Sequence, residues 1–445
     1  MRAIYRYCYL IGDKLRGWGV APKLRELDRM EQWTADQLRQ WQLDRLRRLL
    51  DHACTNVPFY RRLWDEAGAD PAGVRSLDDL AGFPVVTKRQ LVEAGDRALD
   101  RTRPRRSLIE RRSSGSTGEP FVYYIDKDHY GWTVAGGLRG WTWAGWRPGD
   151  RWLRLQFRGR LSWRARLQDR LFNCLYMPID RLDDRFLRRF VPRAIRFRPV
   201  LVRGYAGPTY VLARFLFDNP EFQLRPKAVA CTGHTLYPHY REAIEKAFQA
   251  PVFDAYGGES ICVANQCSHG AYHVLPTAIA EVLPEGPPLD QEQPGRLILT
   301  SLTNYAMPLI RYDIADLGVA GAGDCPCGRR WPVLKRIVGR DTDIIVTAWG
   351  RRLVCHHFNI LRQIDTITQF QVLQRDPAAV TLRLVTAPGH DRRAGEARIA
   401  KDLRHLGGDG LQVAFEYVSV IPVPPSGKRR YVISTVSAGD VAADD

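Results

Sequence analysis

The spacing of apolar residues predicts helices in the N-terminal part of the chain. Over residues 34–50, apolar side chains recur about every 3.6 positions with charged residues between them, which is typical of an amphipathic helix. Pro58 lies shortly after this segment and indicates where the helix ends. Thr87 has the side chain of an N-cap and is predicted to begin a short helix that runs through Glu93.

From residue 121 onward, short apolar segments alternate with helical patterns. Segments rich in β-branched and aromatic residues predict strands at 121–125, 199–205, 228–231, 252–256, 296–300 and 308–312. Helical patterns lie between them at 128–146, from residue 209 and at 240–248. This alternation predicts an α/β fold, with a large N-terminal body of mixed sheets and flanking helices.

The pattern also predicts two domains. A large N-terminal domain is expected over residues 1–340, and a small C-terminal α/β domain over 341–445. Strands of the smaller domain are expected near 369–374, 380–386 and 412–420.

Charge and composition narrow the classes of partner. The chain has 445 residues, of which 66 are Lys or Arg and 49 are Asp or Glu, so its formal net charge is +17. Such a balance favours anionic partners, among them nucleotides, nucleic acid and acidic membrane surfaces. The arginines are spread over the whole chain, which argues against a dedicated nucleic-acid surface.

The sequence predicts neither a membrane span nor a secreted protein. No run of about 18 apolar residues is present. Arginines interrupt the apolar N-terminus, which argues against a signal peptide. The nine cysteines are scattered, so reduced thiols and a cytoplasmic location are expected. A helix at the N-terminus would place Tyr5, Cys8, Tyr9, Gly12 and Leu15 on one face. This face could rest on a membrane or pack in the core, and packing in the core is the preferred interpretation.

A turn rich in serine, glycine and threonine spans residues 113–120, directly before a predicted strand. Glycines there let the backbone approach a ligand, and hydroxyl and N–H groups can hold phosphate oxygens. A solvated loop is the alternative interpretation.

Five segments in a fixed order carry a family resemblance. They are Ser114–Gly118, Asp254–Glu259, Pro308–Gly318, Ile337–Arg340 and Ser426–Arg429. In this order they resemble the motifs of adenylate-forming enzymes, in the phenylacetate–CoA ligase-like branch that includes CapK-like proteins. The resemblance runs from about residue 30 to residue 436.

The resemblance implies a reaction and its cofactors. A carboxylic acid would attack the α-phosphate of ATP in the presence of Mg2+, pyrophosphate would leave, and the acyl-adenylate would pass its acyl group to CoA. Bulky side chains in 121–146 and at Tyr205 and Ala206 suggest an aryl or other apolar acid. An amine or a hydroxyl, for example on a sugar, is the alternative acceptor. A non-catalytic, zinc-bearing or nucleic-acid-binding protein is the alternative of another class, and a homodimer is left open.

The resemblance also assigns nucleotide-binding residues. The phosphates would be held by the turn residues Ser114, Gly115, Ser116, Thr117 and Gly118. Adenine would lie against Tyr256 and Gly257, the ribose hydroxyls would bind Asp316, and His234 would contact adenine or substrate. Considered one at a time, each residue has an alternative interpretation: Tyr256 could be a core residue, and Asp316 could be a turn residue.

Three residues would act in catalysis. Glu259 would lie near magnesium, Arg340 would reach the ribose or a phosphate, and Lys428 would bridge the carboxylate and the α-phosphate in the first step only. Lys428 alone also suits a solvated cationic run. The chain departs from the family's pattern at Glu119, where lysine is frequent, at His234, where glutamate is frequent, and in the shorter Tyr256-to-Glu259 spacing.

A metal site is indicated by Cys267, His273, Cys325 and Cys327. Thiolate and imidazole ligands in a set of four suit tetrahedral Zn2+ in a structural site. The surroundings of Cys267 resemble those in zinc-bearing members of the same branch. His269 is an alternative to His273 as a ligand, and four independent side chains are the alternative to a metal site.

Overall fold

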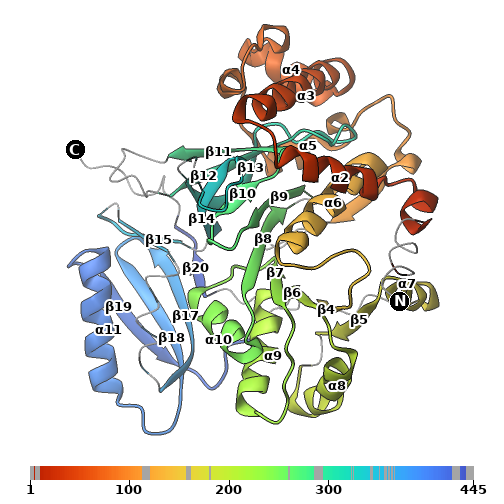
Figure 1. Cartoon of the computed structure of the whole chain (residues 1–445). Coiled ribbons are helices and arrows are strands. Elements are labelled where there is room, and N and C mark those ends of the chain that lie inside the picture. Colours follow the sequence, from red (N-terminus) through yellow and green to blue (C-terminus); the bar gives the residue numbers. More distant parts are fainter. Residues whose placement is uncertain are drawn as a thin grey trace. The chain divides into compact units, whose positions relative to one another are not determined.

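The computed structural model describes residues 5, 11–112, 121–156, 162–179, 182–258, 261–284, 294–321, 323, 325–340, 344–349, 351–354, 358, 361, 364, 366–422 and 431–436 (Figure 1). By packing, the chain divides into two compact units. Unit 1 comprises Met1–Ile314 and Gly318–Ile337, and unit 2 comprises Ala315–Leu317 and Val338–Asp445. The functional division into domains at residue 340 stays a prediction.

The helices and strands have the following bounds. The helices are α2 (Val20–Met30), α3 (Ala35–Asn56), α4 (Pro58–Ala67), α5 (Lys88–Ala94), α6 (Lys127–Trp143), α7 (Trp163–Leu171), α8 (Asp184–Phe197), α9 (Ala206–Asp218), α10 (Pro238–Phe248) and α11 (Arg392–Gly407). The strands are β1 (Val86–Thr87), β2 (Ile109–Arg112), β3 (Val122–Ile125), β4 (Trp152–Gln156), β5 (Cys174–Pro178), β6 (Leu201–Tyr205), β7 (Ala228–Thr232), β8 (Val252–Gly258), β9 (Ile261–Gln266), β10 (Tyr272–Val274), β11 (Ala278–Pro284), β12 (Gly295–Ser301), β13 (Tyr312–Ala320), β14 (Val333–Arg340), β15 (Ile344–Val346), β16 (Arg352–Val354), β17 (Ile367–Asp376), β18 (Ala379–Thr386), β19 (Gln412–Tyr417) and β20 (Val432–Ser434).

A large mixed sheet confirms the predicted α/β class. Its strands follow the order β11-β12-β13-β14-β10-β9-β8-β7-β6-β4-β5, and β1 pairs with β13. The part from β5 to β8 is parallel, and β9 then pairs antiparallel with β8. Helices connect the parallel strands, because parallel neighbours need a long crossover connection. Helix α6 packs on β8 and β9, while α9 and α10 pack on each other and on β6 to β8 (Figure 1).

Local capping explains where two predicted helices begin. The Thr34 side chain accepts a hydrogen bond from the Gln37 backbone, and the Gln37 side chain accepts one in return from the Thr34 N–H. Thr87 and Gln90 form the same capping box at α5. Each box satisfies two backbone donors that a helix N-terminus leaves unpaired. The helix predicted over 34–50 is confirmed.

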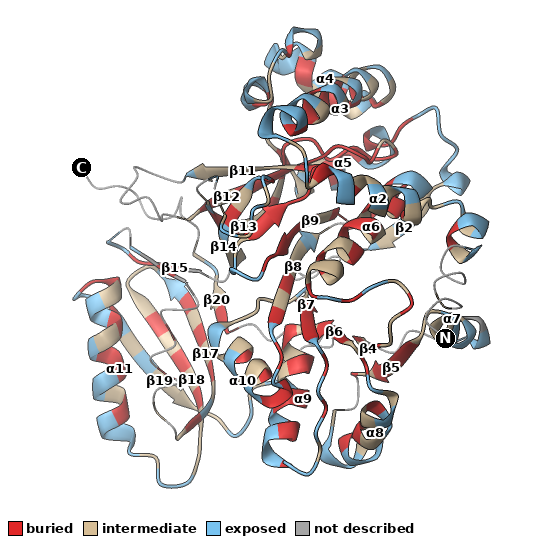
Figure 2. Cartoon of the chain, in the orientation of Figure 1, coloured by how far each residue is buried: buried red, intermediate tan, exposed pale blue. Residues whose placement is uncertain are grey.

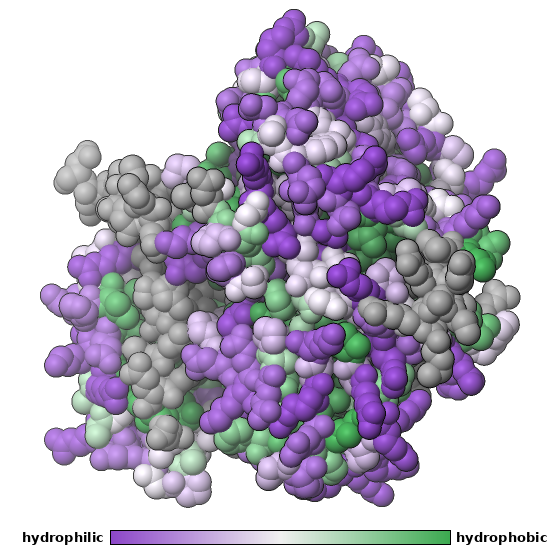
Figure 3. Space-filling model, viewed as in Figure 1, coloured by the Kyte–Doolittle hydropathy of each residue, from purple (hydrophilic) through white to green (hydrophobic). Residues whose placement is uncertain are grey.

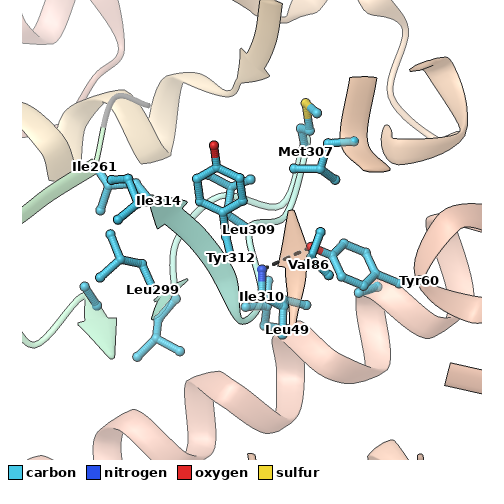
Figure 4. Packing of buried hydrophobic residues seen from close by; sticks show 14 of the residues in the cluster. Leu49, Tyr60, Val86, Ile261, Leu299, Met307, Leu309, Ile310, Tyr312 and Ile314 are labelled. Atoms are coloured by element: carbon cyan, nitrogen blue, oxygen red, sulfur yellow. Dashed lines mark hydrogen bonds between the residues drawn. The ribbon is translucent and has the colours of Figure 1, made fainter. Parts of the chain in front are cut away.

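The main core lies between the N-terminal helices and the part of the large sheet that contains β13. Leu49 on α3 and Tyr60 on α4 are fully buried against Leu309 and Ile310 (Figure 4). The Tyr60 hydroxyl donates to the Pro308 carbonyl (2.9 Å) and accepts from the Ile310 N–H (3.1 Å). Figure 2 shows buried residues concentrated along the strands, with exposed residues on the outer sides of α3 and α11.

The strand predicted over 308–312 is wrong for all but its last residue. β13 begins at Tyr312, because Arg311 has a φ of 47°, which an extended strand does not allow. The Arg311 side chain is buried, forms an ion pair with Glu281 (2.8 Å) and donates to the carbonyls of Ala81 and Phe83. This arginine therefore anchors the sheet to the N-terminal segment.

Unit 2 has its own sheet, in the order β19-β18-β17-β20, with a separate β15–β16 pair. The three strands predicted in this region are confirmed as β17, β18 and β19. The buried Gln374 side chain accepts from the Val346 N–H (3.1 Å) and donates to the Val346 carbonyl (2.7 Å). It thereby ties β15 to β17 without leaving a buried amide unpaired.

Within the described part of the chain, every helix is too short or too polar to cross a lipid bilayer.

Candidate functional site

The carboxyl ends of β6, β7 and β8 meet at one edge of the large sheet. The strands are parallel, and their register pairs Tyr205 with Thr232 and Thr232 with Ala255. In open α/β sheets, ligands bind in the crevice outside such carboxyl ends. Side chains that directly follow these pairs are therefore candidates for ligand contact.

Two aromatic rings stack at this edge. The rings of Tyr205 and His234 have centroids 5.0 Å apart and an interplanar angle of 21°. Gly233 has a φ of 71°, and a Cβ there would lie 2.9 Å from the Tyr205 ring. The close approach of the two rings therefore needs glycine at position 233. Both residues were predicted from the sequence as candidates, but their pairing was not.

Tyr256 and Gly257 lie on the last part of β8, where the β8–β9 register shifts. A Cβ on Gly257 would lie only 2.1 Å from the Ile261 carbonyl oxygen, so this position needs glycine. The Tyr256 ring is half buried and packs against the main core. Part of the Tyr256 side chain therefore packs in the core, and its contact with adenine stays a prediction.

Arg203 is a further candidate for ligand contact, which was not predicted from the sequence. It lies two residues before Tyr205 on β6, so both side chains point to the same face of the sheet. Burial lowers the pKa of its guanidinium, and the charge of Tyr205, when ionised, would raise it. An arginine within an otherwise apolar strand, Pro199 to Tyr205, is the signal that could have identified it.

Two predicted residues belong to unit 2. Asp316 is half buried on β13 and follows Ala315, whose φ is 58°. Arg340 is the last residue of β14, the neighbour of β13 in the sheet. The Arg340 side chain lies outside the described part of the structure.

Other predicted residues lie outside the described part of the chain altogether. They are Ser114, Gly115, Ser116, Thr117 and Gly118 of the turn, together with Glu119, Glu259 and Lys428. Their roles stay predictions.

The four candidate metal ligands lie together in unit 1. One donor atom from each of Cys267, His273, Cys325 and Cys327 lies within 4.8 Å of the others. The sulfur atoms of Cys267 and Cys325 are 3.6 Å apart, and His273 Nε2 lies 3.1 Å from the Cys327 sulfur. His269 does not belong to this cluster, so the geometry favours His273 of the two histidines.

Two similar turns present the three thiols. The N–H of Gly270 donates to the Cys267 carbonyl, and the N–H of Gly328 donates to the Cys325 carbonyl, both at 3.0 Å. Both glycines have positive φ, 82° and 78° respectively. The sequence Cys-x-x-Gly thus forms the same kind of turn twice.

The surroundings favour the ligand forms of these side chains. Burial lowers the pKa of His273, so the imidazole is neutral at pH 7. For Cys327, burial raises the thiol pKa, but hydrogen bonds from the backbone and side chain of Arg329 outweigh it and the net pKa is lowered. The ring of Trp143 lies edge-on to His273 and beneath the Arg329 guanidinium.

This geometry fits a structural zinc site. Zn–S bonds of about 2.3 Å at tetrahedral angles place two sulfurs roughly 3.8 Å apart, close to the observed separation of Cys267 and Cys325. Three thiols and one imidazole also form a donor set that tetrahedral Zn2+ prefers. The four side chains therefore have the donor chemistry for this metal, and the separation of Cys267 and Cys325 matches it.

The comparisons with known proteins agree with this architecture. The family model of the CapK C-terminal domain matches residues 350–435. A solved 2-hydroxyisobutyryl-CoA ligase superposes with a TM-score of 0.72 at 22% identity, covering 92% of this chain and 91% of that chain. This likeness confirms the fold of adenylate-forming ligases.

Two curated relatives are similar in sequence. Protein CapK of Staphylococcus aureus is 23% identical over 380 residues, which are 80% of each chain. A phenylacetate–coenzyme A ligase of Pseudomonas putida is 30% identical over 346 residues, which are 72% of this chain and 74% of that protein. The chain therefore belongs to the phenylacetate–CoA ligase-like family of adenylate-forming enzymes, and it is an AMP-forming ligase.

Proposed function

We propose that this ligase activates an aryl or other flat apolar carboxylic acid with ATP and transfers the acyl group to CoA. The observation that carries the choice of acid is the stacked pair Tyr205 and His234 at the carboxyl edge of the sheet. A flat ring can extend such a stack, and each aromatic contact contributes about 0.5–1.5 kcal/mol beyond burial. The relatives named phenylacetate–CoA ligase support the same class of acid.

The first step brings an anionic carboxylate toward an anionic triphosphate, so positive charge and hydrogen-bond donors must offset the repulsion. Lys428 would bridge the two groups, and the turn over residues 113–118 would hold the phosphates. Asp316 would accept hydrogen bonds from the ribose hydroxyls. Mg2+ near Glu259 would neutralise charge on the phosphate oxygens.

ATP–pyrophosphate exchange tests this proposal directly. With Mg2+ and without CoA, we expect exchange with aryl acids and much less with linear fatty acids of equal carbon number. Tyr205→Ala should raise the KM for the acid more than the KM for ATP. Exchange that prefers fatty acids would contradict the assignment of the aromatic pair to the acid site.

Lys428 gives a test that separates the half-reactions. We expect Lys428→Ala to abolish adenylate formation while leaving thioester formation from a supplied acyl-adenylate nearly unchanged. Arg429→Ala is the matched control, because it removes a cation from the neighbouring position and should affect neither step strongly. Equal loss of both steps in Lys428→Ala would contradict its restriction to the first step.

An amine or hydroxyl acceptor is the second candidate. The likeness to CapK, in the family model over residues 350–435 and in the curated relative, supports this candidate. Mass spectrometry of products formed with CoA, amines and sugars separates the possibilities. Acyl-CoA as the main product supports the first proposal, and an amide or ester formed without CoA supports the second.

We also propose that the Cys267, His273, Cys325 and Cys327 cluster holds one structural Zn2+. Purified protein should contain about one zinc per chain by elemental analysis. Cys325→Ser should reduce that content, whereas Cys54→Ser, a thiol outside the cluster, should not. Full zinc retention in Cys325→Ser would remove Cys325 from the ligand set.

A further inference from the structure

Two neighbouring helical segments of unit 1 present large apolar side chains to solvent. Residues 11–16 are helical, and Leu15 within them is 83% exposed. On α7, Trp163 is 69% exposed. The further exposed members are Ile11, Leu167 and Leu171. Monomeric proteins seldom leave such a cluster without a partner.

The first segment is held in a defined orientation. The buried carboxylate of Asp13 accepts hydrogen bonds from the N–H groups of Val20 (2.8 Å) and Ala21 (2.9 Å) at the start of α2. Gly12 lies against the Phe172 ring, which would be 3.6 Å from a Cβ at that position. With Gly12 and Asp13 facing the protein, Leu15 points outward, so the expected core face is wrong for Leu15.

Contacts at the end of α7 join the two segments. The Arg16 guanidinium donates to the Gln168 side chain (3.0 Å) and lies over the Phe172 ring at 5.7 Å. On α7, Trp163, Leu167 and Leu171 are four residues apart, so they form one stripe along the helix. Figure 3 shows hydrophobic residues, in green, beside the place where Figure 1 labels α7.

The charges that this face turns to solvent are positive. Lys14, Arg166 and Arg170 are exposed. The acidic residues of the two segments are turned inward instead: Asp13 is buried at the start of α2, and Asp169 pairs with Arg154 at 2.6 Å. We call the five apolar residues together with these three cations the basic–apolar face.

We propose that the basic–apolar face docks on an anionic lipid membrane surface. Tryptophan and leucine side chains insert into the boundary between headgroups and acyl chains, while cations at their edge bind anionic headgroups. A protein partner with an apolar groove could also bury the exposed leucines. Because the charged residues around them are all positive, that groove would need many acidic residues along its rim. The net charge of +17 favours the same anionic surface.

Vesicle sedimentation of the full chain tests this proposal. We expect binding to phosphatidylcholine vesicles containing roughly a third phosphatidylglycerol, weaker binding as salt rises, and little binding to phosphatidylcholine alone. The double variant Trp163→Ser, Leu167→Ser should bind at least about tenfold more weakly. Val92→Ser with Phe217→Ser, two exposed apolar residues elsewhere in unit 1, is the matched control and should bind like the unaltered chain.

Charge variants form the second arm. Arg166→Gln and Arg170→Gln should each weaken binding about fivefold, whereas Arg89→Gln on α5 should not. Equal binding to neutral and anionic vesicles, or unchanged binding by the serine double variant, would overturn the proposal. Sedimentation velocity gives a further outcome against it. If the unaltered chain forms dimers but does not bind vesicles, and the double variant is monomeric, the basic–apolar face is an interface with a second copy of the chain.

Discussion

Asp254 is a carboxyl group on β8 whose surroundings favour the protonated form. Burial raises its pKa to about 7, although a hydrogen bond from the Tyr272 hydroxyl (2.7 Å) and the charge of Arg241 both act to lower it. Desolvation thus outweighs the favourable contacts. At neutral pH the folded protein therefore holds a carboxyl group that is only partly ionised.

This raised pKa makes stability depend on pH with a defined sign. An unfolded aspartate loses its proton near pH 4, so between about pH 4 and pH 7 the folded state binds one more proton. The free energy of unfolding should therefore fall as pH rises through this window, by on the order of 4 kcal/mol, and then level off. Asp254→Asn should remove this slope and be more stable than the unaltered chain at pH 8.

Urea unfolding of both chains at several pH values gives the measurement. The difference between the two curves isolates Asp254 from other titrating groups. A difference that does not change between pH 4 and pH 8 would show that Asp254 titrates normally.

Tyr60 stabilises the main core through its hydroxyl as well as its ring. Tyr60→Phe would leave the Pro308 carbonyl and the Ile310 N–H without their partner in a buried site. We expect a loss of about 1–3 kcal/mol in unfolding free energy with normal KM values. Tyr176→Phe, which removes one half-buried hydroxyl, is the control and should cost less. If Tyr60→Phe loses no more unfolding free energy than the control, water or other backbone groups must replace the two hydrogen bonds of the hydroxyl.

Single residues also show what the sequence could and could not predict. The clustering of Cys267, His273, Cys325 and Cys327 could be predicted, because three cysteines and a histidine form a typical donor set for tetrahedral zinc. The contact between Tyr205 and His234 could not, because it depends on strand register and on the left-handed backbone of Gly233. Arg203 could have been predicted, because it is the one charged residue in an otherwise apolar strand, but it lies in none of the family motifs.

At the scale of elements, helices with local caps were predictable and irregular strands were not. Thr34 and Thr87 each form a capping box within four residues, so the signal is contained in the local sequence. The residues before β13 look like a strand, yet Arg311 turns left-handed so that its guanidinium can reach Glu281 and two carbonyls. These partners lie 30 and about 230 residues away in the sequence, so a local pattern does not contain them.

The β8–β9 hairpin gives a prediction at this scale. A Cβ at Gly257 would overlap the Ile261 carbonyl at 2.1 Å, so Gly257→Ala must displace the two strands. We expect a loss of roughly 2–4 kcal/mol in unfolding free energy and a large loss of exchange activity, since Tyr256 moves with the strand. Gly137→Ala on α6, where no atom beyond the chain neighbours and the helix's own backbone lies within 4 Å of the added carbon, is the control and should be neutral or stabilising. An active, fully stable Gly257→Ala would contradict the tight fit.

For the whole molecule, the two units should respond separately to loss of metal. All four proposed zinc ligands lie in unit 1. The two turns that carry the three thiols are 58 residues apart, counted from Cys267 to Cys325, and His273 lies on β10. Strong chelation or Cys267→Ser should lower the unfolding temperature of unit 1 by several degrees, because the constraint between the turns is lost. The transition of unit 2 should not move in calorimetry. A parallel shift of both transitions would indicate that the units unfold as one.

The hydrogen bond from the Ile310 N–H to the Tyr60 hydroxyl also has a consequence for synthesis on the ribosome. Its partners are 250 residues apart, so α3 and α4 cannot complete the burial of their apolar faces until the β12–β13 region has been translated. At about 5–20 residues per second, this interval lasts roughly 12–50 s. During that time the nascent N-terminal segment exposes the side chains around Leu49 and Tyr60. A holding chaperone would therefore be expected to improve the yield of this chain most when it binds the first hundred residues.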